Sequence, residues 1–280
     1  MGKMRPDVIP MMDGFGHVLY PGGRKHSATV SVIMNCLNGA RYLVQALTSV
    51  FAQVYQDFEV IFWDDGSTDS SVAIARSFGQ KVRTYHGPGG LPLGQSRNLA
   101  FGQAEGDYLA ILDVDDLWHK HKLGQQVSFL EAHPSVGLLG SDCHLMDAEG
   151  HSTRTLFQRI APPDGQPYRA LLTRSNYLAS PTLMFRRDVV EKVGGCRATY
   201  RYAELYDLCV QVAQVSGVAM LETPLASYRI HPGNRGGTGH VGMTKEVLDV
   251  MRRHRDGAPL AQYVREGLLW LRLWWQYAYS

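Results

Sequence analysis

Short apolar segments alternate with segments of helical periodicity in the first part of this chain, and that alternation limits the fold more than any other feature. Four segments are rich in β-branched and apolar residues and are predicted to be buried strands, namely 29–35, 58–63, 81–85 and 108–112. The segments predicted as helices between them are 41–53, 70–77 and 95–104. Each connection is long enough for a crossover helix. The pattern therefore predicts an α/β fold, with a parallel sheet covered by helices on both faces.

The pattern loosens after residue 117. Further helices are predicted at 119–133, 187–193, 203–214, 244–254 and 260–277. The segment 136–145 is apolar, and short strands are predicted at 182–185 and 227–230. Prolines and glycines indicate loops at 161–168 and 231–237. Residues 1–28 are glycine-rich and lack an apolar leader segment, so we expect a flexible tail there.

Composition excludes several classes of protein. The 280 residues are 45% hydrophobic and 19% charged, which is typical of a globular protein, and the net charge of +2 gives no reason to expect nucleic acid as a partner. The four cysteines form no C-x-x-C pair, so neither a disulfide framework nor a zinc site is expected, which fits the cytoplasm. No apolar run is long enough to span a membrane.

Two acidic clusters stand where predicted strands end. Asp64-Asp65-Gly66-Ser67-Thr68-Asp69 follows the second strand, and Asp113-Val114-Asp115-Asp116 follows the fourth. Ligands of open parallel sheets bind beyond the carboxyl ends of the strands. The position of both clusters therefore indicates a binding site.

The second cluster suits a divalent cation. If the backbone stays extended, Asp113 and Asp115 point to the same side, where their oxygens, with Asp116 beside them, could hold Mg²⁺ or Mn²⁺. Such an ion would neutralise charge on a departing diphosphate. The alternative is that Asp115 or Asp116 only caps the next helix, but three carboxylates in four residues repel one another without a cation.

The first cluster mixes structural and binding roles. Asp69 or Thr68 is predicted to cap a helix, and Gly66 suits a turn. Asp64 and Asp65 have no such structural need. One of them could accept hydrogen bonds from a nucleobase or a ribose.

An ordered set of motifs resembles the family 2 glycosyltransferases, which have the GT-A fold. The resemblance begins in the opening strand with Val32-Ile33-Met34-Asn35-Cys36-Leu37-Asn38 and continues through the first acidic cluster. It then covers Ser96-Arg97-Asn98-Leu99-Ala100, Ala104-Glu105-Gly106-Asp107-Tyr108 and Leu112-Asp113-Val114-Asp115-Asp116-Leu117-Trp118. Later echoes include Val193-Gly194-Gly195 and Ser227-Tyr228-Arg229-Ile230-His231-Pro232-Gly233-Asn234.

The resemblance implies a role for particular residues on the donor side. Asp65 matches the aspartate that binds the nucleobase, and Asn35 and Asn38 lie on the strand that contacts the base. Asp113 and Asp115 match the D-x-D pair that holds Mn²⁺ or Mg²⁺, with Asp116 beside them. Arg97 and Asn98 would lie near the nucleotide-sugar, and His231 would lie near the metal and diphosphate.

The chain departs from the family at the catalytic base. The family commonly places an aspartate second in a Glu-Asp pair at the start of a helix, whereas this chain reads Ala203-Glu204-Leu205-Tyr206-Asp207. Leucine cannot accept the proton that sugar transfer releases. We expect Glu204 to be the base, with Asp207 as an orienting or backup carboxylate. Asp207 could equally be a buried partner of an arginine, and the chain could be a donor-binding subunit that transfers weakly or not at all.

The resemblance implies one GT-A domain over 29–240, with a donor nucleotide-binding half at 29–118 and an acceptor-side half at 119–240. The function expected is metal-dependent, inverting transfer of a sugar from a nucleoside-diphosphate-sugar to a saccharide or lipid-linked acceptor, as in polysaccharide biosynthesis. Residues 241–280 are predicted as C-terminal helices. Their basic and aromatic composition could support peripheral contact with a membrane, although core packing or a homodimer contact would also explain it.

Overall fold

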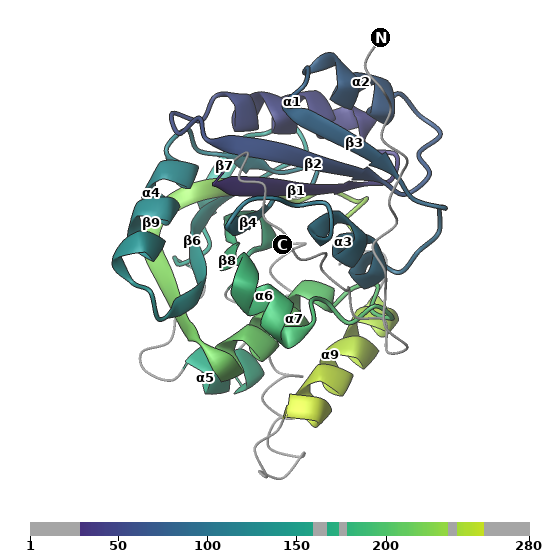
Figure 1. Ribbon diagram of the computed structural model, residues 1–280. Helices are drawn as coiled ribbons and strands as arrows, with labels where there is room; N and C mark the ends of the chain where they lie inside the picture. The colour runs from purple at the N-terminus through teal and green to yellow at the C-terminus, as the bar shows by residue number, and fades with distance from the viewer. Residues whose placement is uncertain (1–28, 159–166, 174–177, 235–239, 255–280) are drawn as a thin grey trace.

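The computed structural model describes residues 29–158, 167–173, 178–234 and 240–254 (Figure 1). The expected tail at 1–28, the predicted helix at 260–277 and most of the predicted loop at 161–168 lie outside the described residues. A single sheet in the order β3-β2-β1-β4-β8-β6-β9-β5 runs through the described part, with β7 paired to β6. The fold is α/β as the alternating pattern predicts, and its sheet is mixed, as expected of the GT-A fold that the motifs resemble.

Four parallel strands form one half of the sheet. They are β1 (Val30–Cys36), β2 (Phe58–Asp64), β3 (Val82–His86) and β4 (Tyr108–Ile111). β1 pairs with β2 on one side and with β4 on the other. The chain thus steps outward from β1 to β3 and then returns to the other side of β1. This reversal is a topological switch point, and it places the carboxyl ends of β1 and β4 side by side.

The other half of the sheet mixes strand directions. It consists of β5 (Leu117–Trp118), β6 (Val136–Met146), β7 (Ser152–Thr155), β8 (Met184–Arg186) and β9 (Gly217–Arg229). β8 runs antiparallel to both β4 and β6, whereas β6 and β9 are parallel. The two-residue strand β5 pairs antiparallel with the end of β9. That short pairing brings the segment after the second acidic cluster next to the segment before His231.

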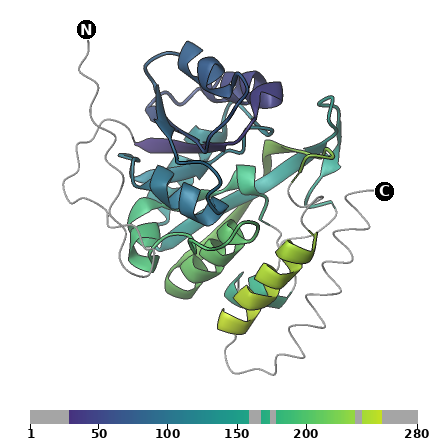
Figure 2. The same cartoon turned by 90° about the vertical axis from the view of Figure 1, so that its right-hand side faces the viewer.

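Helices cover both faces of the sheet (Figures 1 and 2). One face carries α1 (Ala40–Phe51), α2 (Ser71–Ser77) and α4 (Lys122–Ala132), and the other carries α3 (Leu93–Phe101), α6 (Arg187–Val193), α7 (Glu204–Val215) and α9 (His240–His254). The helix α5 (Pro167–Thr173) lies beside α7, and a 3-10 turn (Ser180–Thr182) precedes β8.

The two apolar cores follow from alternation along the strands. In β1, Val32 and Met34 are packed with α1 and α4, while Ile33 belongs to the core that contains α3 and α7. All three side chains are fully buried. Because successive strand residues point to opposite faces, an unbroken apolar run is what a strand covered on both sides requires.

The structure differs from the prediction mainly after residue 116. The strand predicted at 227–230 is the end of the much longer β9, and the helix predicted from 119 begins at Lys122 because β5 comes first. Neither β5 nor β7 was expected. Among the described residues, no helix combines the length and the apolar character needed to cross a membrane.

Candidate active site

The candidate site lies at the carboxyl ends of β1, β2 and β4. Asp65 directly follows β2. Its backbone N–H donates to the carbonyl of Cys36 at 2.9 Å, which ties the tips of β2 and β1 together. The carboxylate Oδ2 accepts the N–H of Leu91 at 3.1 Å. A Cβ at Gly87 would lie 2.9 Å from Asp65 Oδ1, so only glycine lets the loop approach this closely.

Asn35 lies one residue before the end of β1 and has an unusual side chain. Both Nδ2 and Oδ1 of its amide are buried, and neither makes a hydrogen bond within the described part of the chain. Buried amides are nearly always paired, because an unpaired polar group costs about 1–3 kcal/mol. The indole Nε1 of Trp63, in register with Asn35 on β2, is also buried and unpaired there. The tips of β1 and β2 thus offer hydrogen-bonding groups that a ligand could satisfy.

Asn38 has a different role from the one expected. Its Oδ1 accepts the backbone N–H of Thr68 at 2.8 Å, and its own N–H donates to Ser67 Oγ at 2.8 Å. The residue adopts a left-handed conformation with φ of 55°, which asparagine tolerates better than most residues. These contacts favour a role in shaping the turn over the expected contact with the donor.

The backbone of the second acidic cluster is not extended. The N–H of Asp116 donates to the carbonyl of Asp113 at 3.1 Å, so the segment is a turn. The condition under which Asp113 and Asp115 would point to the same side, an extended backbone, is therefore not met. The helix-cap alternative is wrong, because α4 begins only at Lys122, beyond β5.

The three aspartates of this turn have separate environments. Asp113 accepts a hydrogen bond from Ser180 Oγ at 2.8 Å, and Asp115 is paired with His231 at 2.9 Å. Asp116 is 1% exposed, and its Oδ1 accepts the N–H of Arg229 at 2.8 Å. Burial, with the negative charges of Asp115 and Asp113, raises the pKa of Asp116. Asp116 thus holds the turn against β9, which does not support the expected role as a metal ligand.

His231 is oriented by its own loop and by an aromatic ring. The N–H of Gly233 donates to Nδ1 at 3.1 Å, which leaves the proton on Nε2 to be shared with Asp115 Oδ2. The ring centroid of Tyr42 lies 5.1 Å from that of the imidazole. The imidazole therefore presents its Nε2 proton to Asp115.

The donor set fits a Mg²⁺ or Mn²⁺ ion that also binds a ligand's oxygens. Asp113 and Asp115 have side-chain exposures of 31% and 24%, so both carboxylates can be reached from solvent, and His231 holds Asp115 in place. Within the described residues, no three His, Cys, Asp or Glu side chains converge as a fully protein-bound ion would require. Such ions usually bind one or two carboxylates and take their remaining oxygens from substrate phosphates and water.

Arg97 joins Asp113 of the acidic turn to Glu204, the predicted base. It lies on α3, is 1% exposed, and donates from Nη2 to Asp113 Oδ1 at 2.7 Å and from Nε to Glu204 Oε1 at 3.0 Å. Burial alone would lower the pKa of Arg97, but the two carboxylates raise it, so the guanidinium stays charged. Its Nη1 makes no hydrogen bond within the described part of the chain.

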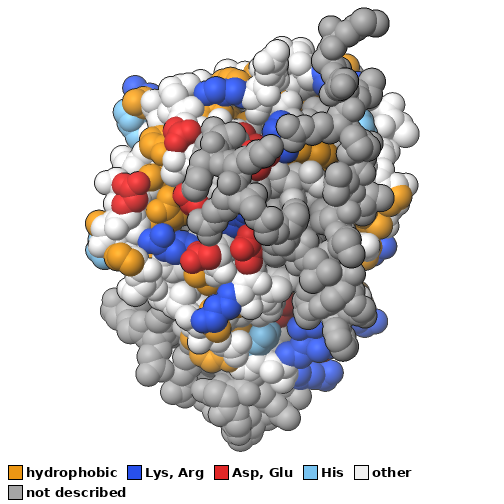
Figure 3. All heavy atoms as spheres, in the orientation of Figure 1, with side chains coloured by type: hydrophobic (Ala, Val, Ile, Leu, Met, Phe, Trp, Pro, Cys, Tyr) orange, Lys and Arg blue, Asp and Glu red, His pale blue; other side chains and the backbone are white. Residues whose placement is uncertain are grey.

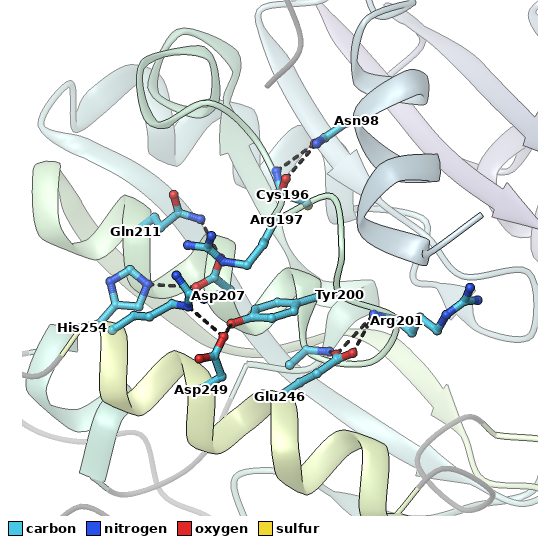
Figure 4. A network of polar contacts seen from close by, with 12 residues as sticks. Asn98, Cys196, Arg197, Tyr200, Arg201, Asp207, Gln211, Glu246, Asp249 and His254 are labelled. Carbon is cyan, nitrogen blue, oxygen red and sulfur yellow. Dashed lines mark hydrogen bonds and ion pairs between the residues drawn. The ribbon is translucent and has the colours of Figure 1, made fainter. Parts of the chain in front are cut away.

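Asn98 points away from this cluster. Its Nδ2 donates to the carbonyl of Cys196 at 2.7 Å, and its Oδ1 accepts the N–H of the same residue at 2.8 Å (Figure 4). The side-chain amide thus makes a pair of hydrogen bonds to one backbone residue, which fastens α3 to the loop before α7. These contacts favour a structural role for Asn98 over the expected contact with the donor.

The start of α7 places Glu204 and Asp207 in different surroundings. Glu204, the first residue of the helix, contacts Arg97 and is 3% exposed. Asp207 is fully buried and accepts from His254 Nε2 at 2.8 Å and Gln211 Nε2 at 2.9 Å, with Arg197 Nε at 3.6 Å (Figure 4). Asp207 is therefore the buried partner of basic groups, which does not support a role as backup base. Leu205 is 8% exposed within the apolar core.

Sequence reasoning missed several contacts of the site. Ser180, which holds Asp113, carries no motif that could have indicated it. Arg229 is fully buried and donates from Nε to the carbonyl of Asp115 at 2.8 Å. Its place two residues before His231, in a segment that resembles the family, was the available signal.

Comparison with known proteins assigns this chain to a family. The family described as Glycosyl transferase family 2 matches residues 31–194, which include Asp65, Arg97 and the second acidic cluster. This chain belongs to glycosyltransferase family 2. It is thus a transferase enzyme, and the predicted GT-A fold is confirmed.

Relatives in the same family are themselves named as glycosyltransferases. The chain is 28% identical over 257 residues to an uncharacterized glycosyltransferase of Nostoc sp., covering 86% of this chain and 76% of the relative. It is 26% identical over 238 residues to the amylovoran biosynthesis glycosyltransferase AmsB of Erwinia amylovora, covering 80% of this chain and 78% of AmsB. It spans only 65% of the length of a longer relative from Rickettsia typhi.

Solved structures share the fold at low sequence identity. TarS residues 1–349 of S. aureus, in complex with UDP-GlcNAc, has a TM-score of 0.69 at 20% identity, covering 89% of this chain and 73% of that one. The mannosyltransferase PcManGT of Pyrobaculum calidifontis, in complex with GDP-Man and Mn²⁺, has a TM-score of 0.63 at 17% identity, covering 93% of this chain and 74% of that one.

Proposed function

We propose that this glycosyltransferase moves a sugar from a nucleoside-diphosphate-sugar to a saccharide or lipid-linked acceptor, with inversion and with the help of a divalent cation. The observation that carries the proposal is the bridge made by Arg97. One buried guanidinium contacts Asp113 of the D-x-D turn and Glu204 of α7, so the predicted cation side and the predicted base share one partner. The structures of TarS with UDP-GlcNAc and PcManGT with GDP-Man support a nucleotide-sugar donor.

The donor nucleotide would bind at the tips of β1 and β2. Asp65 would accept hydrogen bonds from the base, and the unpaired amide of Asn35 would supply one donor and one acceptor. Asp113 and Asp115 would hold the cation, and His231 would orient Asp115 through their hydrogen bond. When bound, that ion would offset negative charge on the departing diphosphate.

Sugar transfer then needs a base that takes the proton from the hydroxyl group of the acceptor. The hydroxyl oxygen of the acceptor forms a bond to the anomeric carbon of the sugar, and its proton passes to the carboxylate of Glu204. The bond between the anomeric carbon and the diphosphate oxygen breaks, and its electron pair leaves with the diphosphate. Arg97 would favour the ionised form of Glu204, which is the form that accepts a proton. The charge of Arg97 would also hold Asp113 in place for the cation.

Glu204 is preferred to Leu205 and Asp207 on the basis of its contacts. Leu205 lies in the apolar core, and Asp207 is buried among His254, Gln211 and Arg197. The donor-binding subunit without a base, raised by Leu205, is not favoured because Glu204 stands beside it at the start of the helix. AmsB is named for amylovoran biosynthesis, which supports a role in polysaccharide biosynthesis.

The test compares Glu204→Gln and Asp115→Ala with the wild-type chain. Sugar transfer and hydrolysis would be measured with UDP-, GDP- and dTDP-sugars, with and without Mn²⁺. Glu204→Gln should lower kcat by about 100-fold or more and leave donor affinity within about twofold. Asp115→Ala should abolish the effect of Mn²⁺ on donor affinity. A wild-type chain that binds donor without turnover, or an Asp115→Ala variant whose donor affinity keeps its dependence on Mn²⁺, would contradict the proposal.

A further inference from the structure

The helix α9 contributes a carboxylate to the backbone that leads into α7. Glu246 accepts three backbone N–H groups in succession, from Arg201 at 3.0 Å, Tyr202 at 2.8 Å and Ala203 at 2.9 Å (Figure 4). These residues immediately precede Glu204, the first residue of α7. A side chain 42 residues later in the chain, counting from 204 to 246, thus fixes the entry to the helix that carries the proposed base.

The N-cap residue of α7 makes no side-chain hydrogen bond to the helix. The first N–H groups of a helix have no partner within the helix, and a serine, threonine or aspartate before the helix usually accepts one of them. Here the N-cap is Ala203, whose side chain cannot do so. The carboxylate of Glu246 also complements the positive end of the helix dipole. Glu246 instead accepts the N–H groups of the N-cap residue and of the two residues before it, and so fixes the chain where it enters the helix.

Other contacts hold α9 firmly enough for Glu246 to act as a fixed point. Tyr200 Oη donates to Asp249 Oδ2 at 2.6 Å, and His254 Nε2 lies 2.8 Å from Asp207 Oδ1 (Figure 4). Val250 and Met251 are buried in the core that includes α7. The helix is thus tied to the segment 200–207 along its whole described length.

The position of Glu204 depends on this anchoring, because Glu204 directly follows the three residues that Glu246 holds. The Oε1 of Glu204 meets Arg97 Nε at 3.0 Å, and Arg97 in turn meets Asp113. A shift of the backbone at 201–203 would move Glu204 relative to both. Displacements of about 1 Å at a reacting group can reduce a rate by about 100-fold.

We propose that Glu246 is a positioning residue, which holds the backbone before α7 so that the carboxylate of Glu204 faces the acceptor hydroxyl. This inference rests on the proposed function of Glu204 as the base. Residues 195–254, which contain both glutamates, lie beyond the part of the chain that matches the family.

The experiment uses the full chain and three variants. Glu246→Ala removes the acceptor of all three N–H groups, Glu246→Gln keeps one carbonyl oxygen, and Tyr200→Phe removes a different bond between α9 and the same segment. Measured quantities are kcat, the KM values of donor and acceptor, donor affinity, Tm and hydrogen exchange at the amides of 201–203. Glu246→Ala should lower kcat by about tenfold or more with donor affinity within about twofold, and should speed exchange at those amides.

The two other variants separate positioning from stability. Glu246→Gln should recover part of the lost kcat, because its remaining oxygen still accepts N–H groups. Tyr200→Phe should lower Tm but should lower kcat by less than Glu246→Ala does, because the contacts of Glu246 remain. An unchanged kcat in Glu246→Ala, or an equal loss of kcat in Tyr200→Phe at the same loss of Tm, would overturn the inference.

Failure of the proposed function would look different. If the wild-type chain transfers no sugar, or if Glu204→Gln retains full kcat, the base assignment fails first, and the positioning role fails with it. Hydrogen exchange at 201–203 would then still show whether Glu246 holds this backbone. If Glu204→Gln is inactive while Glu246→Ala is fully active with slowed or unchanged exchange, only the inference about Glu246 is overturned.

Discussion

His231 Nε2 lies 2.9 Å from Asp115 Oδ2, although the two residues are 116 positions apart in the sequence. The ring is held on one side by the N–H of Gly233 and on another by Tyr42. Asp115 is held from behind by the turn that Asp116 fastens to β9. Both partners are therefore fixed before any ligand binds.

Removing the imidazole should weaken cation binding. We expect His231→Ala to raise the Mn²⁺ concentration needed for half-maximal transfer by about tenfold or more, because metal ligands and their immediate partners are usually worth at least that much. A Mn²⁺ titration of the transfer rate measures the effect. His151→Ala is the matched control, since His151 Nδ1 also pairs with an aspartate, Asp147, but at an exposed site. An equal Mn²⁺ requirement in the two variants would remove His231 from the cation site.

Removing the guanidinium of Arg97 should destabilise the fold. Arg97→Ala would leave Asp113 and Glu204 without their shared cation, and loss of one member of a buried ionic cluster costs about 3–5 kcal/mol. Urea unfolding measures the difference. The control is Arg187→Ala, which breaks a more exposed pair with Glu191 on α6 and should cost less than about 1 kcal/mol. Similar unfolding midpoints for the two variants would show that the Arg97 cluster contributes little.

Restoring the family's aspartate should not restore a base. Leu205 is 8% exposed within the apolar core, so Leu205→Asp would bury a carboxyl group without a prepared partner and should cost several kcal/mol. Leu205→Met, of similar volume, should cost less than about 1.5 kcal/mol. Urea unfolding and transfer assays would compare them. A stable Leu205→Asp variant with faster transfer would mean that position 205 faces the acceptor after all.

The buried Lys122 should make stability depend on pH. Burial lowers its pKa, so the folded protein releases a proton that the unfolded chain keeps up to about pH 10.4. The unfolded state then binds more protons between the two pKa values, and the contribution of Lys122 to the free energy of unfolding rises with pH over that window.

A comparison with Lys122→Met isolates this contribution. Urea unfolding at pH values rising toward about pH 10.4 should show the free energy of unfolding of the wild-type chain increasing relative to that of the variant, by up to about 1.4 kcal/mol per pH unit. Subtraction removes the effect of the buried cysteines, which both chains share. The variant also leaves Gln126 Oε1 without the Nζ that donates to it at 2.6 Å, but that cost does not change with pH. Parallel pH profiles would show that Lys122 keeps its proton when buried.

The sequence was sufficient to predict the parallel half of the sheet and the position of the site. Strands such as β1 and β2 are buried on both faces, so their apolar runs are unbroken and their ends are sharp. Asp65 and the D-x-D turn stand directly after such ends, which is why they could be predicted. Family membership is confirmed by comparison, whereas the roles of individual site residues stay predictions.

What the sequence could not show depends on contacts between distant segments. A two-residue strand such as β5 has no periodicity to detect, and it exists only because β9 supplies its hydrogen bonds. Glu204 and Asp207 are three residues apart on one helix, so spacing suggested a shared role. Their actual partners, Arg97 on α3 and His254 on α9, separate them, and no local rule predicts those partners.

The pairing of β5 with β9 has a consequence for how the protein is made. Leu117 and Trp118 pair with Ser227 and Ala226. The turn that holds Asp115 can therefore be supported by β9 only after more than a hundred further residues have been synthesised. Contacts between segments so far apart form slowly, because a long loop must close first. A nascent chain can therefore complete β1 to β4 early, but the pair of Asp115 and His231 forms late. A chain ending before β9 would carry the D-x-D motif without the residues that orient it.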